Sequence, residues 1–385
     1  MIAYLDNSAT TRAADEVALL VAKVMTEEYG NPSSVHHMGT IASNRLIDAR
    51  EILSSTLKVT PQEIVFTSGG TESDNMAILG VSRAMSHSGK HVITTSVEHP
   101  AVLESFEELK REGFEVSILP VDGEGRVRLS DLEKAIRPDT VLVSMMHVNN
   151  EIGSVMPIEE AGRLIKSVNP KTLFHVDAVQ SYGKFIIRPR SMNIDLLSVS
   201  SHKIHGPKGV GFLYVKKGTR INPIGYGGGQ QKGLRSGTEN VPGIAGMALA
   251  AQISYTDFDE KIGRLREMRD YLTASLKERI PDITINGPER ESVAPHIVSV
   301  SIKGLRAETV LNMLSDKEIY VSAGSACTSN NPHVSNTLKA IGLDTDLLES
   351  TIRISMSHYT TREEIDYLLD TLESSVDTMR KFYRH

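Results

Sequence analysis

The stretch Ser200-Ser201-His202-Lys203 directly follows the apolar run Asp195-Leu196-Leu197-Ser198-Val199. The apolar run predicts a buried strand, and the tetrapeptide predicts the loop into which that strand exits. Strand ends that face a cleft are where α/β proteins place their chemistry. Burial there disfavours the ammonium form of Lys203 and frees its amine as a nucleophile that can form a Schiff base with an aldehyde. For this lysine alone, a solvated loop position is the better interpretation. Whether Lys203 is a reactive amine therefore depends on the other residues of the chain.

Length and composition bound the class of protein. The chain has 385 residues, of which 40% are hydrophobic and 23% charged, and these values are typical of a soluble globular enzyme with two or three domains. The net charge of −6 does not favour binding to nucleic acid or to a membrane surface. We expect no signal peptide, because the N-terminus has no basic region followed by an apolar one.

Cysteine and histidine usage argues against a metal site. Cys327 is the only cysteine, which excludes an intramolecular disulfide and a cysteine-rich zinc site and favours a reducing, cytoplasmic location. His36 and His37 are adjacent and diverge on any regular element, so we interpret them as loop histidines. We therefore expect no metal.

Strand-like apolar runs alternate with helical patterns over most of the first 250 residues. This alternation predicts a mainly parallel sheet covered by helices. From Val241 one long helical pattern runs to Leu276, and we place a domain change within it near residue 250. We expect a large domain over residues 13–250 and a smaller α+β domain over residues 1–12 and 251–385. The predicted strands of the large domain are 63–67, 91–95, 115–119, 141–146, 173–176, 195–199 and 210–215.

The commonest aldehyde cofactor is pyridoxal phosphate (PLP). A PLP site needs an acid for the pyridine nitrogen, a face for the ring, a cradle for the phosphate and a cation for the substrate carboxylate. The candidate cradle is Ser68-Gly69-Gly70-Thr71-Glu72, which joins a predicted strand to a predicted helix. Small residues and free N–H groups at a helix N-terminus bind phosphate. An ordinary turn capped by Ser68 or Thr71 is the alternative.

Three polar side chains near predicted strand ends could serve the ring. His99 follows the strand over 91–95 and could stack on a flat cofactor. Asp177 ends the strand over 173–176 and could pair with a protonated pyridine nitrogen, while Gln180 could reach the ring oxygen. Taken alone, His99 is more often a capping or packing histidine, and Asp177 a helix cap or surface carboxylate.

Four further features remain open on residue chemistry alone. Lys208 is a rival Schiff-base lysine, ranked lower because Pro and Gly flank it. The Gly-rich segment 225–238 is either a flexible surface loop or a backbone-donor loop near a phosphate. Cys327 lies among small polar residues, which predicts an exposed, mobile loop with an incidental or a reactive thiol. Arg353 lies in a strand pattern, where its guanidinium needs a partner and matches a carboxylate.

Nine segments match one family in order along essentially the whole chain, and together they are far more specific than any one of them. The chain resembles the cysteine desulfurases, PLP enzymes of the class V aminotransferase group with the fold type I architecture. The segments are Leu5-Asp6-Asn7-Ser8-Ala9-Thr10-Thr11, Gly30-Asn31-Pro32-Ser33-Ser34, Thr67-Ser68-Gly69-Gly70-Thr71-Glu72-Ser73-Asp74-Asn75, Glu98-His99, His147-Val148-Asn149-Asn150-Glu151-Ile152-Gly153, His175-Val176-Asp177-Ala178-Val179-Gln180, Ser200-Ser201-His202-Lys203, Arg235-Ser236-Gly237-Thr238 and Gly324-Ser325-Ala326-Cys327.

The resemblance implies a role for each candidate residue. Lys203 carries the Schiff base and moves the proton, and Cys327 is the nucleophile. His99 stacks on the pyridine ring, Asp177 pairs with its nitrogen, and Gln180 bonds its phenolic oxygen. The phosphate is bound by Gly70, Thr71, Ser200 and His202, together with Thr238 from the neighbouring subunit of a homodimer. The substrate carboxylate is bound by Asn149, Arg353 and Asn7.

The resemblance also implies an architecture and a reaction. The architecture is a large PLP-binding domain with a mainly parallel sheet of the seven-stranded type, and a smaller α+β domain. L-cysteine becomes L-alanine and a persulfide on Cys327, whose sulfur passes to an acceptor protein for iron–sulfur cluster assembly or for thiolation of tRNA or a cofactor. Gly70 stands where the family often has Ala, and we expect this departure to be harmless.

Three alternative functions remain open. The first is a selenocysteine lyase, and the second is another class V PLP transaminase, which would need no cysteine in such a loop. The third belongs to a different class: a catalytically silent PLP-fold protein that acts as an assembly partner. The presence of Lys203, Asp177 and Cys327 together argues against this third alternative.

Overall fold

The computed structural model describes residues 1–289, 292–323, 327–328, 331–332 and 335–383. Its largest sheet has seven strands, and β8 runs antiparallel to both of its neighbours while the other six strands share one direction. This confirms the predicted α/β class with a mainly parallel sheet. The strand order is β2 (Ile64–Thr67), β8 (Gly211–Val215), β7 (Leu196–Ser200), β6 (Leu173–Asp177), β5 (Thr140–Met146), β3 (His91–Thr95) and β4 (Glu115–Leu119).

Helices cover both faces of this sheet, because side chains along each strand alternate between the two faces. In β7, for example, Leu197 and Val199 pack into one apolar cluster and Leu196 packs into another. The first cluster includes side chains from α1 (Asp15–Thr26), α2 (His37–Leu57), α6 (Leu129–Ala135), α7 (Ile158–Val168) and α8 (Val241–Tyr255). The second includes side chains from η2 (Met76–Gly80), α4 (Val81–Met85) and α5 (Pro100–Arg111).

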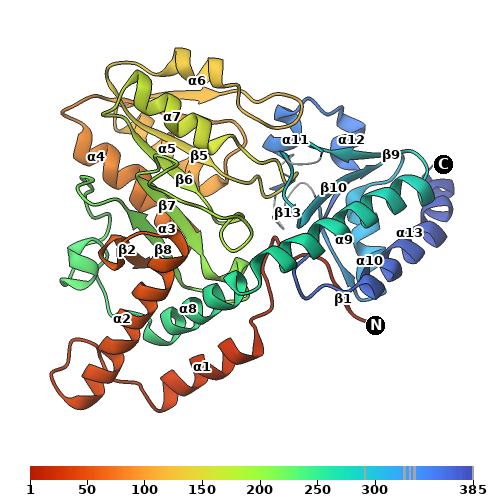
Figure 1. Ribbon diagram of the computed structural model, residues 1–385. Coiled ribbons are helices and arrows are strands. Elements are labelled where there is room, and N and C mark those ends of the chain that lie inside the picture. Colours follow the sequence, from red (N-terminus) through yellow and green to blue (C-terminus); the bar gives the residue numbers. More distant parts are fainter. Residues whose placement is uncertain (290–291, 324–326, 329–330, 333–334, 384–385) are drawn as a thin grey trace.

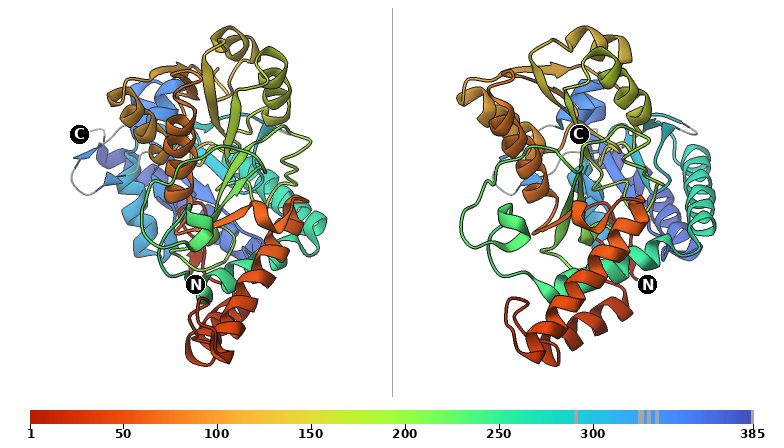
Figure 2. Two further views of the ribbon diagram at one scale, coloured as in Figure 1. Left: turned by 90° about the vertical axis from the view of Figure 1, so that its left-hand side faces the viewer. Right: turned by 60° about the vertical axis from the view of Figure 1, so that its left-hand side comes forward.

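A second apolar core lies on the other side of the molecule, around a four-stranded antiparallel sheet (Figures 1 and 2). Ala3 and Leu5 from the N-terminus pack into this second core with residues from 262 onward. The first core is formed by residues between Ala14 and Ala251. The sheet order is β12 (Ser322–Ala323), β15 (Thr351–Ser355), β10 (Ile297–Ile302) and β9 (Ile283–Asn286), and α9 (Phe258–Arg279), α10 (Ala307–Asp316) and α13 (Arg362–Tyr383) pack against it.

Shorter elements complete the part of the chain that is described. β1 (Ala3–Tyr4) pairs in parallel with β11 (Ile319–Tyr320), and β13 (Cys327–Thr328) pairs with β14 (Asn331–Pro332). The others are α3 (Gly70–Asn75), α11 (Asn336–Ala340), α12 (Thr345–Glu349) and the 3₁₀ turns η1 (Pro61–Glu63), η3 (Ser201–Lys203) and η4 (Gln230–Gly233). Among all the residues that the structure describes, no helix is long and apolar enough to cross a membrane.

The long helical pattern predicted from Val241 to Leu276 is two helices, α8 and α9, so that prediction is corrected. Asp257 between them takes a left-handed conformation with φ 49°. Lys261 Nζ closes the end of α8 by donating to the carbonyls of Ile253 and Thr256, at 2.7 and 2.8 Å. A lysine that bonds the last carbonyls of a helix stabilises its C-terminus.

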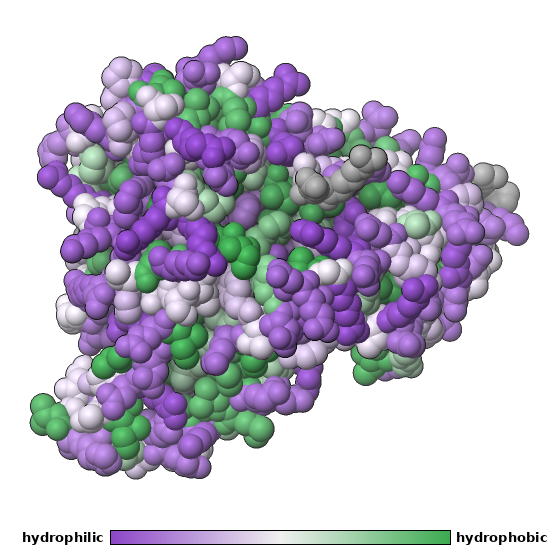
Figure 3. Space-filling model, in the orientation of Figure 1, coloured by the Kyte–Doolittle hydropathy of each residue, from purple (hydrophilic) through white to green (hydrophobic). Residues whose placement is uncertain are grey.

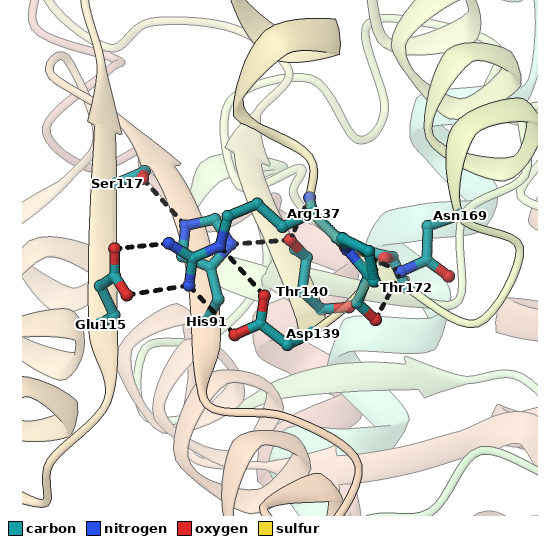
Figure 4. Close-up of polar contacts among 9 residues, drawn as sticks. His91, Glu115, Ser117, Arg137, Asp139, Thr140, Asn169 and Thr172 are labelled. Carbon is teal, nitrogen blue, oxygen red and sulfur yellow. Dashed lines mark hydrogen bonds and ion pairs between the residues drawn. The ribbon is translucent and has the colours of Figure 1, made fainter.

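The amino ends of β3, β4 and β5 are joined by a polar network (Figure 4). His91 begins β3, and its two ring nitrogens lie 2.7 Å from Thr140 Oγ1 and 2.9 Å from Ser117 Oγ. Burial lowers the pKa of His91, so the ring is held neutral between two hydroxyls. Arg137 adds a bridge between Glu115 and Asp139. Because this network closes the amino-end edge of the sheet, the opposite, carboxyl-end edge is the one left for a site.

Exposed apolar side chains gather on α1, α2 and the segment that joins them. These helices project from the rest of the molecule in all three ribbon views (Figures 1 and 2). Apolar surface is visible at this end of the space-filling view (Figure 3). The side chains are Leu19, Met25, Tyr29, Val35 and Ile47.

Candidate active site

A pocket of about 390 Å³ opens at the carboxyl ends of the large sheet. Loops after β2, β3, β5, β6 and β7 line it, together with the N-terminal segment and β15 of the small sheet, so both apolar cores contribute to it. Ligands of α/β proteins bind at this edge of a parallel sheet. The pocket is lined by Ser8, Ala9, Gly70, Thr71, Asp74, His99, Met146, Val148, Asn150, Asp177, Val179, Gln180, Ser200, His202, Lys203 and Arg353.

Lys203 reaches the pocket from the 3₁₀ turn η3 that directly follows β7. Its Nζ donates to the carbonyl oxygens of Ser8 and Ala9, at 2.5 and 2.8 Å. Burial lowers the pKa of Lys203 to about 8, and the positive charge of Arg353 acts in the same direction. A lysine whose pKa is lowered in this way supplies a neutral, nucleophilic amine near neutral pH.

His99 is the N-cap of α5, directly before Pro100. Its Nδ1 accepts a hydrogen bond of 3.1 Å from the backbone N–H of Ala101. A ring nitrogen that accepts from an N–H carries no proton, so in the neutral ring the proton is on Nε2. Burial lowers the pKa of His99, which keeps the ring neutral at the pocket wall. The capping alternative and the ring-stacking hypothesis are therefore compatible: one nitrogen caps the helix while the ring lines the pocket.

Asp177 ends β6, and its Oδ1 accepts a 2.8 Å hydrogen bond from Val179 N–H. Two more carboxyl groups, Asp74 and Glu98, are buried nearby. Burial raises the pKa of all three, that of Glu98 to about 8, and the negative charge of Asp177 adds to the effect on Asp74 and Glu98. For Asp177 the hydrogen bond from Val179 N–H and the positive charge of Lys203 act against burial, so it is the member of the three that is best able to stay ionised.

The carbonyl of Ser8 joins two site residues. It accepts from Gln180 Nε2 at 3.0 Å as well as from Lys203 Nζ. The same residue is tied to the small sheet, because Ser8 N–H donates to Ser355 Oγ at 2.8 Å. Gln180 Oε1, in contrast, is buried without a hydrogen-bond partner among the described residues. The amide is thus oriented by Ser8, and its oxygen is left to bind a group in the pocket.

The Gly-rich turn after β2 has the geometry of an anion cradle. Gly69 has φ 149°, a conformation that L side chains rarely adopt, and Gly70 begins the helix that follows. Thr71, Ser200 and His202 line the same part of the wall. Free N–H groups at the start of a helix, with hydroxyls beside them, are a binding site for phosphate.

Gly70, which departs from the family pattern, is accommodated at this turn. A Cβ added at Gly70 would lie 2.7 Å from Cγ2 of Val179, well inside van der Waals contact. Both residues line the pocket. The two are therefore matched: Gly at 70 leaves room for the branched side chain at 179.

Arg353 lies in the middle of β15, with its side chain mostly buried. Its Nη1 donates to the carbonyl of Asn150 at 2.9 Å, and its Nη2 donates to Asp6 Oδ1 at 3.0 Å. Nε is buried without a partner in the described part of the chain. Because a guanidinium has five N–H groups, Arg353 is held by two of them and can offer others to an anion in the pocket.

Three predicted residues are not brought into this pocket. Asn149 is buried and turns away from it, because its Oδ1 accepts from the backbone N–H groups of Glu151 and Ile152, at 2.9 and 3.0 Å, and its Nδ2 donates to Val97 O. This geometry does not place the Asn149 amide in the pocket, and its predicted contact with the substrate stays a prediction. The neighbouring Asn150 lines the pocket instead.

Asn7 and Thr238 also lie outside the pocket lining. The Asn7 amide donates to the carbonyls of Tyr4 and Ser355, so it fastens the N-terminal segment to the small sheet rather than facing the pocket. Thr238 is exposed, in the segment after η4. Arg235 of the same Gly-rich segment bonds Glu72 at 3.1 Å, which holds this segment beside the anion cradle.

The predicted nucleophile lies where the structure describes only the backbone. Cys327 begins β13 and pairs with Pro332 of β14, and its side chain lies outside the described residues, as do Gly324, Ser325 and Ala326. The role of Cys327 stays a prediction.

Several pocket residues were not identified as functional from the sequence. Asp74 lies one turn into α3, whose other residues are also small or polar, so no local signal set it apart. The tandem Asn149-Asn150 offered a signal, because an asparagine often bonds the backbone two residues on and forms a turn. Ser8, Ala9 and the Asp6 partner of Arg353 had no local signal, since their contacts span most of the chain.

Comparison with known proteins gives one consistent result. Residues 3–368 match the family model for aminotransferase class-V. A protein of Dictyoglomus turgidum named "Cysteine desulfurase IscS" is 44% identical over 377 residues, which is 98% of this chain and 95% of that protein. A solved structure titled "NIFS-LIKE PROTEIN" superposes with a TM-score of 0.93 at 41% identity, covering 98% of this chain and 100% of its own. A second, titled "SspA in complex with cysteine", gives 0.81 at 34% identity and covers 93% and 99%.

Proposed function

Because this chain belongs to the aminotransferase class-V family, we propose that it is a PLP-dependent cysteine desulfurase that converts L-cysteine to L-alanine and carries the sulfur away as a persulfide. The family match confirms the resemblance stated from the sequence, and with it the cofactor. The observation that carries the proposal is the convergence of Lys203, Asp177, His99 and Arg353 on one pocket. Beside the lysine, a buried acid, a flat ring, the anion cradle after β2 and a guanidinium supply the four parts that a PLP site for an amino acid needs.

The residues of the pocket fit PLP. The buried Gln180 Oε1 lacks a partner and is available to the phenolic oxygen of the ring. Asp177 is one of three buried carboxyl groups, and a protonated pyridine nitrogen would supply the cation that this group of carboxyls lacks. Gly69 and Gly70 let the backbone approach a phosphate closely, and Thr71, Ser200 and His202 supply donors.

The chain's own residues divide the work between proton transfer and substrate orientation. When bound, PLP acts as an electron sink that makes the α-proton of an amino acid acidic. Lys203 takes and returns that proton, because its lowered pKa leaves a neutral amine near neutral pH. Arg353 binds the α-carboxylate of L-cysteine through the N–H groups not used by Asp6 and Asn150, and Asn150 borders the same position.

Cys327 completes the proposal as the nucleophile. Its thiolate attacks the sulfur of the substrate, the carbon–sulfur bond breaks, and the products are L-alanine and a persulfide on Cys327. The sulfur then passes to an acceptor protein, for iron–sulfur cluster assembly or for thiolation of tRNA or a cofactor. Relatives named cysteine desulfurase, and a structural neighbour described as a complex with cysteine, support this substrate.

We also propose a cytoplasmic homodimer with no nucleic acid or membrane partner. The exposed apolar side chains of α1 and α2 support the homodimer, because apolar patches on a soluble protein commonly mark an interface. Thr238 of the partner subunit would join the phosphate site, which agrees with its position outside the pocket of its own chain. The two apolar cores support a division into two domains; the proposed boundaries are 12/13 and 250/251, although the first core extends to Ala251.

The proposal is tested by product analysis with the purified protein, PLP and a thiol reductant. L-cysteine is expected to give L-alanine and sulfide in equal amounts. L-selenocysteine is the comparison substrate, and a strong preference for it would replace the desulfurase by a selenocysteine lyase. Transfer of the amino group to a keto acid, without sulfide, would indicate a transaminase.

A further inference from the structure

A second lysine lies directly behind the turn that carries Lys203. Lys184 follows Gly183, which has φ 77°, in the segment after β6. Its Nζ donates a 2.9 Å hydrogen bond to the backbone carbonyl of Lys203. In the same turn, the carbonyl of His202 accepts from Thr11 N–H and Oγ1, both at 2.9 Å. The orientation of Lys203 therefore depends on Thr11 on one side and Lys184 on the other.

The surroundings of Lys184 are basic. Burial lowers the pKa of the His205, His296 and His358 imidazoles, and the positive charge of the nearby Lys184 lowers it further. Burial, and then the charge of Lys203, lowers the pKa of Lys184 itself to about 7, and no carboxylate offsets them. Lysine commonly titrates near 10.4, so this amine changes its charge in the physiological range.

Hydrogen-bonding groups without a partner in the described part of the chain, and a small cavity, lie near Lys184. Within the described residues, both ring nitrogens of His296 and Nε2 of His358 are buried without a partner. A cavity of about 20 Å³ lies between Lys184, Lys203, His205, Lys261 and His358. That volume holds about one water molecule, which polar groups on its walls can bind.

We propose that Lys184 is a positioning residue for Lys203, because it fixes the turn through the Lys203 carbonyl. The two amines also influence each other's protonation: when one carries a proton, protonation of the other becomes less favourable. Two ammonium groups in one poorly solvated site repel each other, and the pair titrates as a unit. This inference rests on the proposed role of Lys203 as the reactive amine, but it does not depend on the sulfur chemistry.

The test measures the amine of Lys203 rather than turnover. Only the neutral amine reacts with an aldehyde or an acylating reagent. The pH dependence of PLP uptake by the full-length cofactor-free chain therefore reports the charge of Lys203, and so does that of trace acetylation at Lys203 followed by peptide mass spectrometry. The variants are Lys184→Met, which removes donor and charge, and Lys184→Arg, which keeps the donor and is always charged.

The two variants are expected to affect Lys203 differently. Lys184→Arg lowers the midpoint of Lys203 reactivity by about one pH unit, because a fixed positive charge disfavours the Lys203 ammonium. Lys184→Met leaves the midpoint close to the wild-type value, because Lys184, with a pKa of about 7, is already mostly neutral where Lys203 titrates. It slows PLP uptake about tenfold at the plateau, because the turn is no longer held. Lys261→Met is the matched control: Lys261 lines the same cavity but bonds Ile253 and Thr256, so it is expected to lower the melting temperature and leave the midpoint unchanged.

Two results would overturn the proposal. A Lys184→Arg midpoint identical to that of wild type would show that a charge at position 184 does not disfavour the Lys203 ammonium. A Lys184→Met variant that loses stability like Lys261→Met, with an unchanged uptake profile, would make Lys184 merely structural. If instead the wild type shows the expected titration of Lys203 by acetylation but takes up no PLP, the proposed function fails while the coupling of the two lysines stands.

Discussion

Arg353 Nη2 lies 3.0 Å from Asp6 Oδ1, so a residue at the start of the chain positions a guanidinium near its end. Both side chains belong to the part of the site that the small sheet and the N-terminal segment supply. A mostly buried arginine that lost this partner would lose both its orientation and its charge compensation.

Asp6→Ala is therefore expected to raise KM for L-cysteine about tenfold with a much smaller change in kcat, because Arg353 would bind the substrate carboxylate less well. Steady-state kinetics of alanine formation measure this. Ser322→Ala is the matched control: Ser322 pairs with Arg353 across the sheet and its Oγ donates to the same Asp6 oxygen at 2.7 Å, so the variant removes a partner of Asp6 but leaves the hydrogen bonds of the guanidinium in place. An unchanged KM in Asp6→Ala would show that Arg353 does not depend on Asp6.

Alanine substitutions at the adjacent residues Asn149 and Asn150 are expected to have different effects, one on stability and the other on KM. Asn149→Ala removes the acceptor for two backbone N–H groups in a buried turn and is expected to cost about 1–3 kcal/mol of folding free energy. Asn150→Ala is expected to leave the free energy of unfolding unchanged and to raise KM, because its side chain lines the pocket. Denaturant unfolding and kinetics of both variants check this, and the reverse assignment of the two defects would contradict the geometry.

Gly70 and Val179 are expected to be coupled. Gly70→Ala places a Cβ 2.7 Å from Val179 Cγ2, and the resulting shift of the cradle is expected to weaken PLP binding about tenfold. Val179→Ala should restore binding in the double variant, since it removes the contacting methyl group. Dissociation constants from absorbance titrations of the four proteins complete a double-mutant cycle, and additive effects would argue against the matched pair.

Glu98 is expected to make the cofactor-free protein less stable as pH rises. Its pKa is raised to about 8 in the folded state from an ordinary value of 4.5, so the folded state binds more protons between those pH values. Its contribution to stability is therefore present at low pH and is lost as pH rises toward 8. Glu98→Gln removes this titration, and the difference in melting temperature between wild type and variant should shrink or reverse from pH 5 to pH 9. A difference that does not vary with pH would mean that Glu98 is ionised when buried.

Much of the fold was predictable because its signals are local. All seven strands of the large sheet lie within about two residues of their predicted bounds, since apolar runs and the breaks between them depend on neighbours in the sequence. The break between α8 and α9 was not predicted, because the apolar pattern continues across Asp257 and only its left-handed backbone separates the helices. The short strand β9 was also missed.

The site residues also differ in whether a local sequence signal could predict them. Lys203, His99, Asp177 and Gln180 were found because each lies directly after a strand. The choice between Asn149 and Asn150, the contact between Gly70 and Val179, and the partner of Arg353 depend on which side chains meet in three dimensions. The domain boundaries, the homodimer and the role of Cys327 stay predictions.

The central claim is that the sulfur of L-cysteine leaves through a persulfide on Cys327. The most direct measurement is single-turnover reaction of the PLP-loaded protein with L-cysteine in the absence of reductant, followed by mass spectrometry of the peptide that contains Cys327, for wild type beside Cys327→Ala. The account predicts one added sulfur atom on Cys327 and one alanine per active site in wild type, and PLP binding without alanine formation in Cys327→Ala. Equal alanine formation by the two proteins, with no sulfur on Cys327, would contradict it.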